Sequence, residues 1–349
     1  MTHLNRSFVR IAACVACAIA PAAQAIEPIP ETPGWRGFVL GGAGYLDFKT
    51  NLVAGNTIVD IGNTTIDSVN DAPESDSASL PVFTGEVSYT FGNRSQVFFG
   101  TSLEDAVTLD AVTQLGVRKD LGSAGAVQAG FLFSGIPGEV WEDPYAEGVE
   151  RDPTDRDSSG VRVQWDRIMG SAFEFTLSYR DISIDTERSG EGVLSVACDA
   201  ACQALLVRDG DQYTADVSYL FRLGQGQRPR HLLRPMFRYR IDDRDGDAIA
   251  GDGYRLQLSY IYLGDGFTVA SNVAFGAHSY DEANPIYGVK TDSDVFAVDT
   301  TLFYRLPTES GRWQLVGNLL WGEDDSDVDF HDNEVFMVSL GAMYRFGQR

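Results

Sequence analysis

One pattern of side chains repeats along almost the whole chain. Apolar residues alternate with polar or small residues in fourteen segments, and most segments are eight or more residues long. Side chains of a β-strand point alternately to opposite faces of the sheet, so each segment predicts a strand with one apolar face. The predicted strands are residues 35–49, 81–91, 95–104, 109–121, 125–135, 159–166, 172–184, 212–223, 232–242, 254–263, 267–280, 294–305, 312–322 and 335–346.

The connections between these segments alternate in length. Residues 92–94 and 264–266 are short turns, whereas residues 50–80, 136–158 and 185–211 are long loops. The strands of a soluble β-sandwich also alternate apolar and polar residues. Long loops on one side, short turns on the other and an even number of strands are, however, typical of outer-membrane barrels. Backbone groups in lipid must all be paired, so a spanning sheet must close. We predict an all-β, transmembrane, antiparallel up-and-down barrel of about 14 strands, with short periplasmic turns and long outer loops.

The two ends of the chain agree with this prediction. Arg6 and Arg10 precede an apolar run at 11–20, and Ala23-Gln24-Ala25 follows, which predicts a signal peptide over residues 1–25. Residues 26–34 are then a short periplasmic segment and residues 35–349 one barrel domain. We expect both termini to be periplasmic, in the outer membrane of a Gram-negative bacterium.

The last predicted strand ends with Tyr344 and Phe346 on its apolar face. It resembles the C-terminal insertion signal of outer-membrane barrels, so we expect both residues to bind the barrel-assembly machinery. The tail Gly347-Gln348-Arg349 is a departure, because it places the last aromatic residue three positions early. In the first predicted strand, the residues expected to face lipid are Phe38, Leu40, Leu46 and Phe48.

Composition excludes some classes of function. The formal net charge is −23, from 50 acidic and 27 basic residues, whereas a nucleic-acid partner needs a basic face. Cys198 and Cys202 remain after removal of the signal peptide and predict a disulfide in an oxidising compartment. A redox or metal-binding pair is the alternative. We predict no cofactor.

Charged residues of the predicted inner face suggest two walls. Arg180, Arg238, Arg240 and Arg255 come from the seventh, ninth and tenth strands, and Glu86, Glu104 and Asp110 from the second to fourth. Opposed walls would set up a field across the pore that orients polar solutes. The alternative is that neighbouring charges pair on the wall, since Asp242 lies close to the arginines.

The predicted outer loops are acidic at 147–157, 242–252 and 323–332. Oxygen-rich loops suit Ca²⁺ or Mg²⁺, and Asp243-Arg244-Asp245-Gly246-Asp247 resembles part of a calcium loop, although solvated charge is the simpler interpretation. A third interpretation, intermediate between these two, is that divalent ions bridge the loops to lipopolysaccharide. A hydrolase would need a base such as His278 or His331, but lone histidines are more often ordinary polar positions, so we expect no enzyme.

Several loop motifs carry a family resemblance. They are Thr101-Ser102-Leu103-Glu104-Asp105-Ala106, Glu139-Val140-Trp141-Glu142-Asp143-Pro144-Tyr145 with Gly160-Val161-Arg162, Arg180-Asp181-Ile182, Asp245-Gly246-Asp247-Ala248 and Tyr280-Asp281-Glu282-Ala283-Asn284-Pro285-Ile286. The chain resembles an uncharacterised proteobacterial outer-membrane family that is catalogued as a domain of unknown function. The resemblance implies the barrel fold and the membrane location, and it implies no activity.

The expected function is porin-like passage of small hydrophilic solutes. The alternatives are a plugged barrel that acts as a surface structural or interaction protein through its acidic loops, or an outer-membrane hydrolase. The loop at 136–158 is a candidate constriction loop, and an outward cap is the other interpretation of it.

Overall fold

The computed structural model describes residues 29–56, 58–101, 112–134, 138–224, 230–308 and 310–347. The predicted signal peptide, Glu104 and Asp110 lie outside the described residues. Within the described residues, the α-helix Ala200–Ala204 (α1) is short, and no helix is long and apolar enough to span a membrane.

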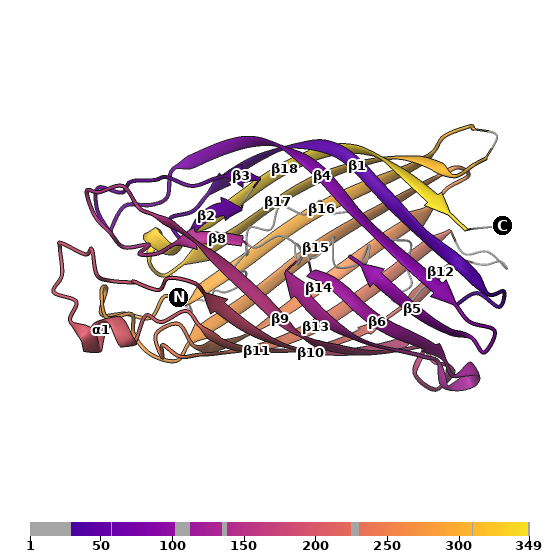
Figure 1. Ribbon diagram of the computed structural model, residues 1–349, viewed down its shortest axis with the longest axis horizontal. Coiled ribbons are helices and arrows are strands. Elements are labelled where there is room, and N and C mark those ends of the chain that lie inside the picture. The colour runs from indigo at the N-terminus through magenta and orange to yellow at the C-terminus, as the bar shows by residue number, and fades with distance from the viewer. Residues whose placement is uncertain are drawn as a thin grey trace.

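Fourteen strands form one closed antiparallel barrel, as the sequence predicts (Figure 1). Each strand pairs with its neighbours along the chain. The strands are β1 (Gly34–Lys49), β4 (Ser75–Thr90), β5 (Ser95–Gly100), β6 (Val112–Asp120), β7 (Ala126–Ser134), β9 (Pro153–Asp166), β10 (Phe173–Ile184), β11 (Gly210–Tyr219), β13 (His231–Arg244), β14 (Gly251–Leu263), β15 (Phe267–Tyr280), β16 (Ser293–Arg305), β17 (Trp313–Ser326) and β18 (Asn333–Phe346).

The barrel closes at β1, which pairs with β4 on one side and with β18 on the other. The register of β18 runs from Gly37 opposite Phe346 to Lys49 opposite Glu334. A Cβ atom at Gly37 would collide with the Glu86 carbonyl and the Phe346 ring, so glycine lets the three strands approach closely at this point.

Several strands begin earlier than the apolar alternation indicates. β4 starts at Ser75 and β9 at Pro153, and the first residues of both strands are mostly polar. Backbone pairing continues there beyond the apolar band, where outward side chains no longer need to be apolar. By contrast, β15 has the predicted bounds, because its alternation continues to both ends.

The connections lie at two distinct ends, which we call the turn end and the loop end. The turn end has short connections such as 264–266, together with the C-terminal end of β18 (Figure 1). β12 (Phe221–Leu223) continues the line of β11 there. The loop end carries α1 and three more short strands, which are β2 (Val53–Asn56), β3 (Val59–Asp60) and β8 (Gly138–Trp141).

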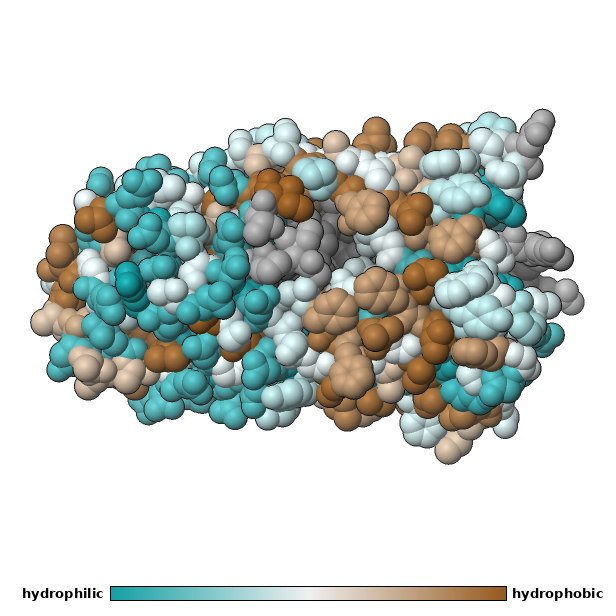
Figure 2. All heavy atoms as spheres, viewed as in Figure 1, coloured by the Kyte–Doolittle hydropathy of each residue, from teal (hydrophilic) through white to brown (hydrophobic). Residues whose placement is uncertain are grey.

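The outer face of the barrel is apolar. Phe83 is 79% exposed, Phe131 66% and Leu340 65%, although all three are large and hydrophobic. Figure 2 shows hydrophobic residues gathered over the strands toward the turn end and hydrophilic residues over the loop end. Aromatic pairs such as Trp313–Tyr344 and Tyr179–Tyr213 lie near the two ends of the strands, as in the interfacial girdles of membrane barrels.

The first strand corrects one prediction. Phe38, Leu40, Leu46 and Phe48 are buried, whereas Val39 and Tyr45 of β1 are exposed. In the middle of β1, over residues 37–46, both faces are apolar or small, so alternation cannot choose between them. The partner strand decides, because residues paired in an antiparallel sheet point to the same side. Phe38 is paired with Glu86 and Leu40 with Thr84, which puts both on the lumen side.

Neighbouring residues of β14 allow a direct test of the lipid-facing surface. Leu258 is on the exposed face, and Gln257 is on the lumen face beside Asn272. Leu258→Arg should lower the free energy of unfolding in lipid vesicles by about 2–4 kcal/mol, because the charge enters the bilayer. Gln257→Arg is the matched control and should have a much smaller effect; equal losses would contradict this assignment of faces.

Candidate functional site

The lumen side of the barrel carries a wall of ion pairs. Arg118 binds Glu86 through both terminal nitrogens at 2.7 Å, and Arg234 binds Glu174 at 2.9 Å. Further along, Arg238 donates to both oxygens of Asp216 at 2.7 and 2.8 Å. These side chains are largely buried, and a buried charge is tolerated when it is paired. The lumen face between β4 and β14 is therefore charged but locally neutralised.

Asp242 is the centre of the densest part of this wall. It lies 2.7 Å from both Arg240 and Arg244, and it accepts a hydrogen bond from Gln212 at 2.9 Å. His278 lies 4.0 Å from the same carboxylate. Two guanidinium groups thus share the carboxylate of Asp242 near the loop end.

The structure also places the histidines that a hydrolase would need. The His278 ring lies over β14 at Gly253, where a Cβ atom would be 3.0 Å from the ring, so glycine makes room for the imidazole. His331 lies within the loops, where its Nε2 is 3.3 Å from the hydroxyl of Tyr145. The two histidines thus belong to different clusters.

Most of the predicted pore-lining residues lie on this wall. Glu86, Arg238 and Arg240 have the partners described above, and Arg180 and Arg255 are buried on the lumen face. Glu104 and Asp110 lie outside the described residues. Asp216 pairs with Arg238 and Asp242 with Arg240, as in the alternative of neighbour pairing. A field across the lumen stays a prediction.

Another part of the lumen wall carries an apolar cluster. Leu40, Leu80 and Met337 belong to a buried cluster that extends over β1, β4 and β13 to β18. Val53, Val59 and Ile61, from the connection 50–74, pack into this cluster, so β2 and β3 lie against the inside of the wall. The lumen therefore has a charged side and a second side, which we call the apolar side, where this cluster lies beside the polar residues Asn272, Asp299 and Asn318.

The long loops form a cap with its own hydrophobic core at the loop end. Tyr145 lies at the centre, stacked on Phe330 with ring centroids 5.6 Å apart. Its hydroxyl also accepts a hydrogen bond from Asn284 at 3.2 Å. Six connections supply the core, through Ile66, Val69, Tyr145, Leu206, Ala248, Ile249, Ile286 and Phe330. We call this assembly the loop cap.

Glu147 joins three parts of the loop cap. Its carboxylate accepts hydrogen bonds from the backbone N–H groups of Val69 at 3.0 Å, Leu194 at 2.7 Å and Ser195 at 2.8 Å. Burial alone would raise the pKa of Glu147, but these N–H groups more than offset burial, so its pKa is below the usual value. The ionised carboxylate thus accepts hydrogen bonds from backbone N–H groups that, in a β-sheet, would bond to a neighbouring strand.

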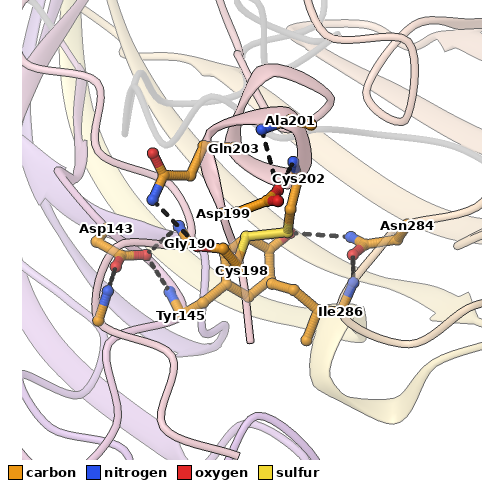
Figure 3. Close-up of a disulfide and its surroundings, with 11 residues drawn as sticks. Asp143, Tyr145, Gly190, Cys198, Asp199, Ala201, Cys202, Gln203, Asn284 and Ile286 are labelled. Carbon is orange, nitrogen blue, oxygen red and sulfur yellow. Dashed lines mark hydrogen bonds between the residues drawn. A yellow bond between two sulfur atoms is a disulfide. The ribbon is translucent and has the colours of Figure 1, made fainter. Parts of the chain in front are cut away.

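Asp143 and Arg151 make similar connections. Asp143 accepts hydrogen bonds from the N–H groups of Gly190 at 2.9 Å and Gly192 at 2.6 Å (Figure 3). Arg151 donates to the carbonyls of Asn51, Asn63 and Pro144. Burial lowers the pKa of Arg151 to about 10. Buried backbone groups without a regular ladder need such partners.

A disulfide closes the outermost part of the cap. Cys198 and Cys202 are joined across α1, with Cα atoms 5.1 Å apart (Figure 3). Asp199 begins the helix by accepting hydrogen bonds from the N–H groups of Ala201 and Cys202. This is an ordinary N-cap, which positions both sulfurs on one short turn.

Two sequence hypotheses concern these loops. In the segment 136–158, β8 pairs with β9 and with β2 of the inward hairpin, and the following residues supply Tyr145 and Glu147 to the cap. In the calcium-like segment, the N–H of Gly246 binds the Val207 carbonyl at 3.1 Å, joining two loops. Among the described residues, no group of three or more His, Cys, Asp and Glu could hold a metal ion.

Sequence reasoning missed the loop cap itself. The sequence predicts only a polar loop around Tyr145, Glu147 and Arg151. The sequence does contain one signal of the cap. Apolar residues such as Ile249 and Phe330 occur within the acidic loops, and a fully solvated loop has no need of them.

A closed antiparallel barrel with an apolar outer band is an outer-membrane β-barrel. Residues 34–345 match the family described as "Protein of unknown function (DUF2860)", and the chain belongs to this family. The predicted resemblance is therefore confirmed. No curated protein matches the chain.

Solved structures with a similar arrangement are outer-membrane proteins. The anion-selective porin of Comamonas acidovorans has 11% identity and a TM-score of 0.37, covering 90% of this chain and 99% of the porin. A FadL homologue of Pseudomonas aeruginosa has 12% identity and a TM-score of 0.44, with coverages of 89% and 90%. The COG4313 outer membrane channel of Pseudomonas putida F1 has 11% identity and a TM-score of 0.44, with coverages of 94% and 100%. Similarities this low say nothing about a solute.

The role of Glu147 can be tested by neutralising it. Glu147→Gln should reduce the local stability of the loop cap by about 1.5–3 kcal/mol, because charge-assisted hydrogen bonds are lost. The measurement is hydrogen exchange of residues 142–152, corrected for intrinsic rates. Glu150→Gln, in the same loop but exposed, is the matched control and should leave exchange unchanged.

The lowered pKa of Glu147 also sets a pH dependence. A carboxyl group whose folded pKa is below its unfolded value of about 4.3 stabilises the cap fully above that value. This contribution is lost as pH falls through the folded pKa. Exchange in the wild-type cap should therefore increase in acid, and the Glu147→Gln cap should respond less. Equal responses would contradict the assignment to Glu147.

Proposed function

We propose that this protein is an outer-membrane channel for the passive diffusion of small hydrophilic solutes. The observation that carries the proposal is the charged lumen wall, which runs from Arg118 on β6 to Arg255 on β14 behind an apolar outer face. Charged side chains favour a wet interior over a dry one, because desolvating each of them is costly.

The size of the barrel supports the proposal. Side chains of the wall alone fill the interior of a barrel of about eight strands, and this barrel has fourteen. The hairpin of β2 and β3 reduces the remaining space on the apolar side, where Val53 and Ile61 pack. The route for a hydrophilic solute would then follow the charged side.

The loop cap favours a second candidate function. Its buried core, centred on Tyr145, is more extensive than a set of solvated loops requires. A barrel closed by such a cap could act as a surface structural or interaction protein, with its acidic loops toward lipopolysaccharide or a partner. For either function, we propose that the loop end faces the outside of the cell and that the barrel-assembly machinery binds Tyr344 and Phe346.

Single-channel conductance of the refolded protein in a planar bilayer separates the two functions. We expect steady ohmic steps for a channel. A barrel that is folded, by its heat-modifiable migration in gels, yet never conducts would refute the channel and leave the surface role.

The charged wall predicts the selectivity of the conducting protein. Arg238→Gln should shift the reversal potential in a salt gradient toward that of the cation, because Asp216 loses its partner. The double variant Arg238→Gln with Asp216→Asn should return toward the wild-type value, since the pair is removed as a unit. Unchanged reversal potentials in the single variant would show that permeating ions do not approach this wall.

A further inference from the structure

The turn end of the barrel carries more basic than acidic side chains, although the chain as a whole has a net charge of −23. The loop end has the opposite balance, since residues 60–76 and 323–334, for example, contain many acids and no Lys or Arg. The described acids of the turn end are Glu31, Asp120, Asp166 and Asp265. The described basic residues there are Arg36, Arg94, Lys119, Arg167, Arg222, Arg230, Arg305, Arg312 and Arg345.

Three of these, Arg36 of β1, Arg222 of β12 and Arg305 of β16, lie on the lumen face at the mouth of the barrel. Side chains two residues apart on a strand share a face, and so do residues paired across antiparallel strands. Arg36 and Arg305 each lie two residues from a phenylalanine of the apolar cluster in the lumen wall, and Arg222 is paired with a leucine of that cluster. These apolar neighbours are Phe38, Phe303 and Leu232. We call the three arginines the arginine mouth.

The charges of the arginine mouth lack a carboxylate partner within the part of the chain that the structure describes. Arg222 and Arg305 are exposed, and Arg36 donates to the uncharged hydroxyl of Thr32 at 3.3 Å. The described acids of the turn end, apart from Glu31, have partners of their own. These ion pairs are Arg94–Asp120, Arg167–Asp166 and Arg230–Asp265. The mouth therefore keeps an excess of positive charge, unlike the paired charges deeper in the lumen wall.

Charge of one sign around a mouth raises the local concentration of ions of the opposite sign. At about 0.1 M salt the Debye length is about 10 Å, so the arginines act on ions well away from the wall, whereas at about 1 M salt it is only about 3 Å. The acidic loops act in the same way on cations at the other end. A solute that crosses the barrel thus passes one end that attracts cations and one that attracts anions.

We propose that the arginine mouth selects solutes at the turn end of the channel and favours small anions there, while the acidic loop end favours cations. The inference rests on the proposed channel function and deepens it, because it assigns opposite preferences to the two mouths.

One consequence is a current that depends on the direction of the voltage. When the chamber at the loop end is positive, cations held by the acidic loops and anions held by the arginine mouth are both driven into the lumen. When that chamber is negative, both kinds of ion are drawn out of the lumen. The conductance at low salt is therefore higher in the first case. At about 1 M salt, screening should restore ohmic steps.

Reversal potentials in a potassium chloride gradient, applied in both directions across the full-length protein, test this assignment. The mouth on the dilute side dominates the selectivity, because its charges are screened least. With the dilute solution at the turn end, the ratio of anion to cation permeability should be about twofold or more above the ratio for the reverse gradient. Streptavidin binding to a biotin on Val289→Cys, an exposed loop position, identifies the chamber at the loop end. Equal ratios for the two gradients would overturn the proposal.

Variants test whether the selectivity belongs to the arginine mouth. The triple variant Arg36→Gln, Arg222→Gln and Arg305→Gln should remove most of the difference between the two gradients. Arg222→Gln alone, at an exposed site that tolerates substitution, should remove part of it. The double variant Arg230→Gln with Asp265→Asn is the matched control, because it removes an ion pair at the same end and leaves the net charge unchanged. A difference that persists in the arginine variants, or that the control loses equally, would overturn this role.

The same recordings keep the two proposals separate. A protein that conducts equally in both directions at about 0.1 M salt, with equal selectivity for both gradients, would refute the arginine mouth and leave the channel intact. A folded protein that never conducts would refute both.

Discussion

Every feature of this protein depends on one constraint, which is that a backbone in lipid must satisfy all of its hydrogen bonds within itself. The pairing of β1 with both β4 and β18 meets this condition by closing the sheet. Closure separates an outer face, which must be apolar, from an inner face that is free to carry charge. Close approach at the seam requires Gly37, since a larger residue would displace Phe346 and the neighbouring backbone.

The same need for partners shapes the loop cap by different means. Loops have no regular ladder, so buried backbone groups there are satisfied by side chains. Glu147 accepts three N–H groups, and Arg151 donates to three carbonyls of other loop residues. Charged groups in these positions give the cap a defined structure and make part of its stability dependent on pH.

The two sides of the lumen define what the protein can do. On the charged side, Arg238 pairs with Asp216, and Arg240 and Arg244 share Asp242, so the wall is hydrophilic and its charges have partners close by. On the apolar side, Val53 and Ile61 of the inward hairpin reduce the space.

The sequence by itself determined the barrel, because alternation in strands such as β15 and the contrast between turns and loops follow directly from the two-faced environment of a membrane sheet. It also predicts that Glu86, Arg238 and Arg240 lie on the inner face, since polar residues there alternate with apolar ones. It could not choose the face of β1, where both sides are apolar or small, until pairing of Phe38 with Glu86 fixed it. Nor could it reveal the loop cap, because Tyr145, Phe330 and Ile249 come from separate loops. Only tertiary structure brings such residues together, since their contacts depend on the closed barrel that holds the loop ends in a ring.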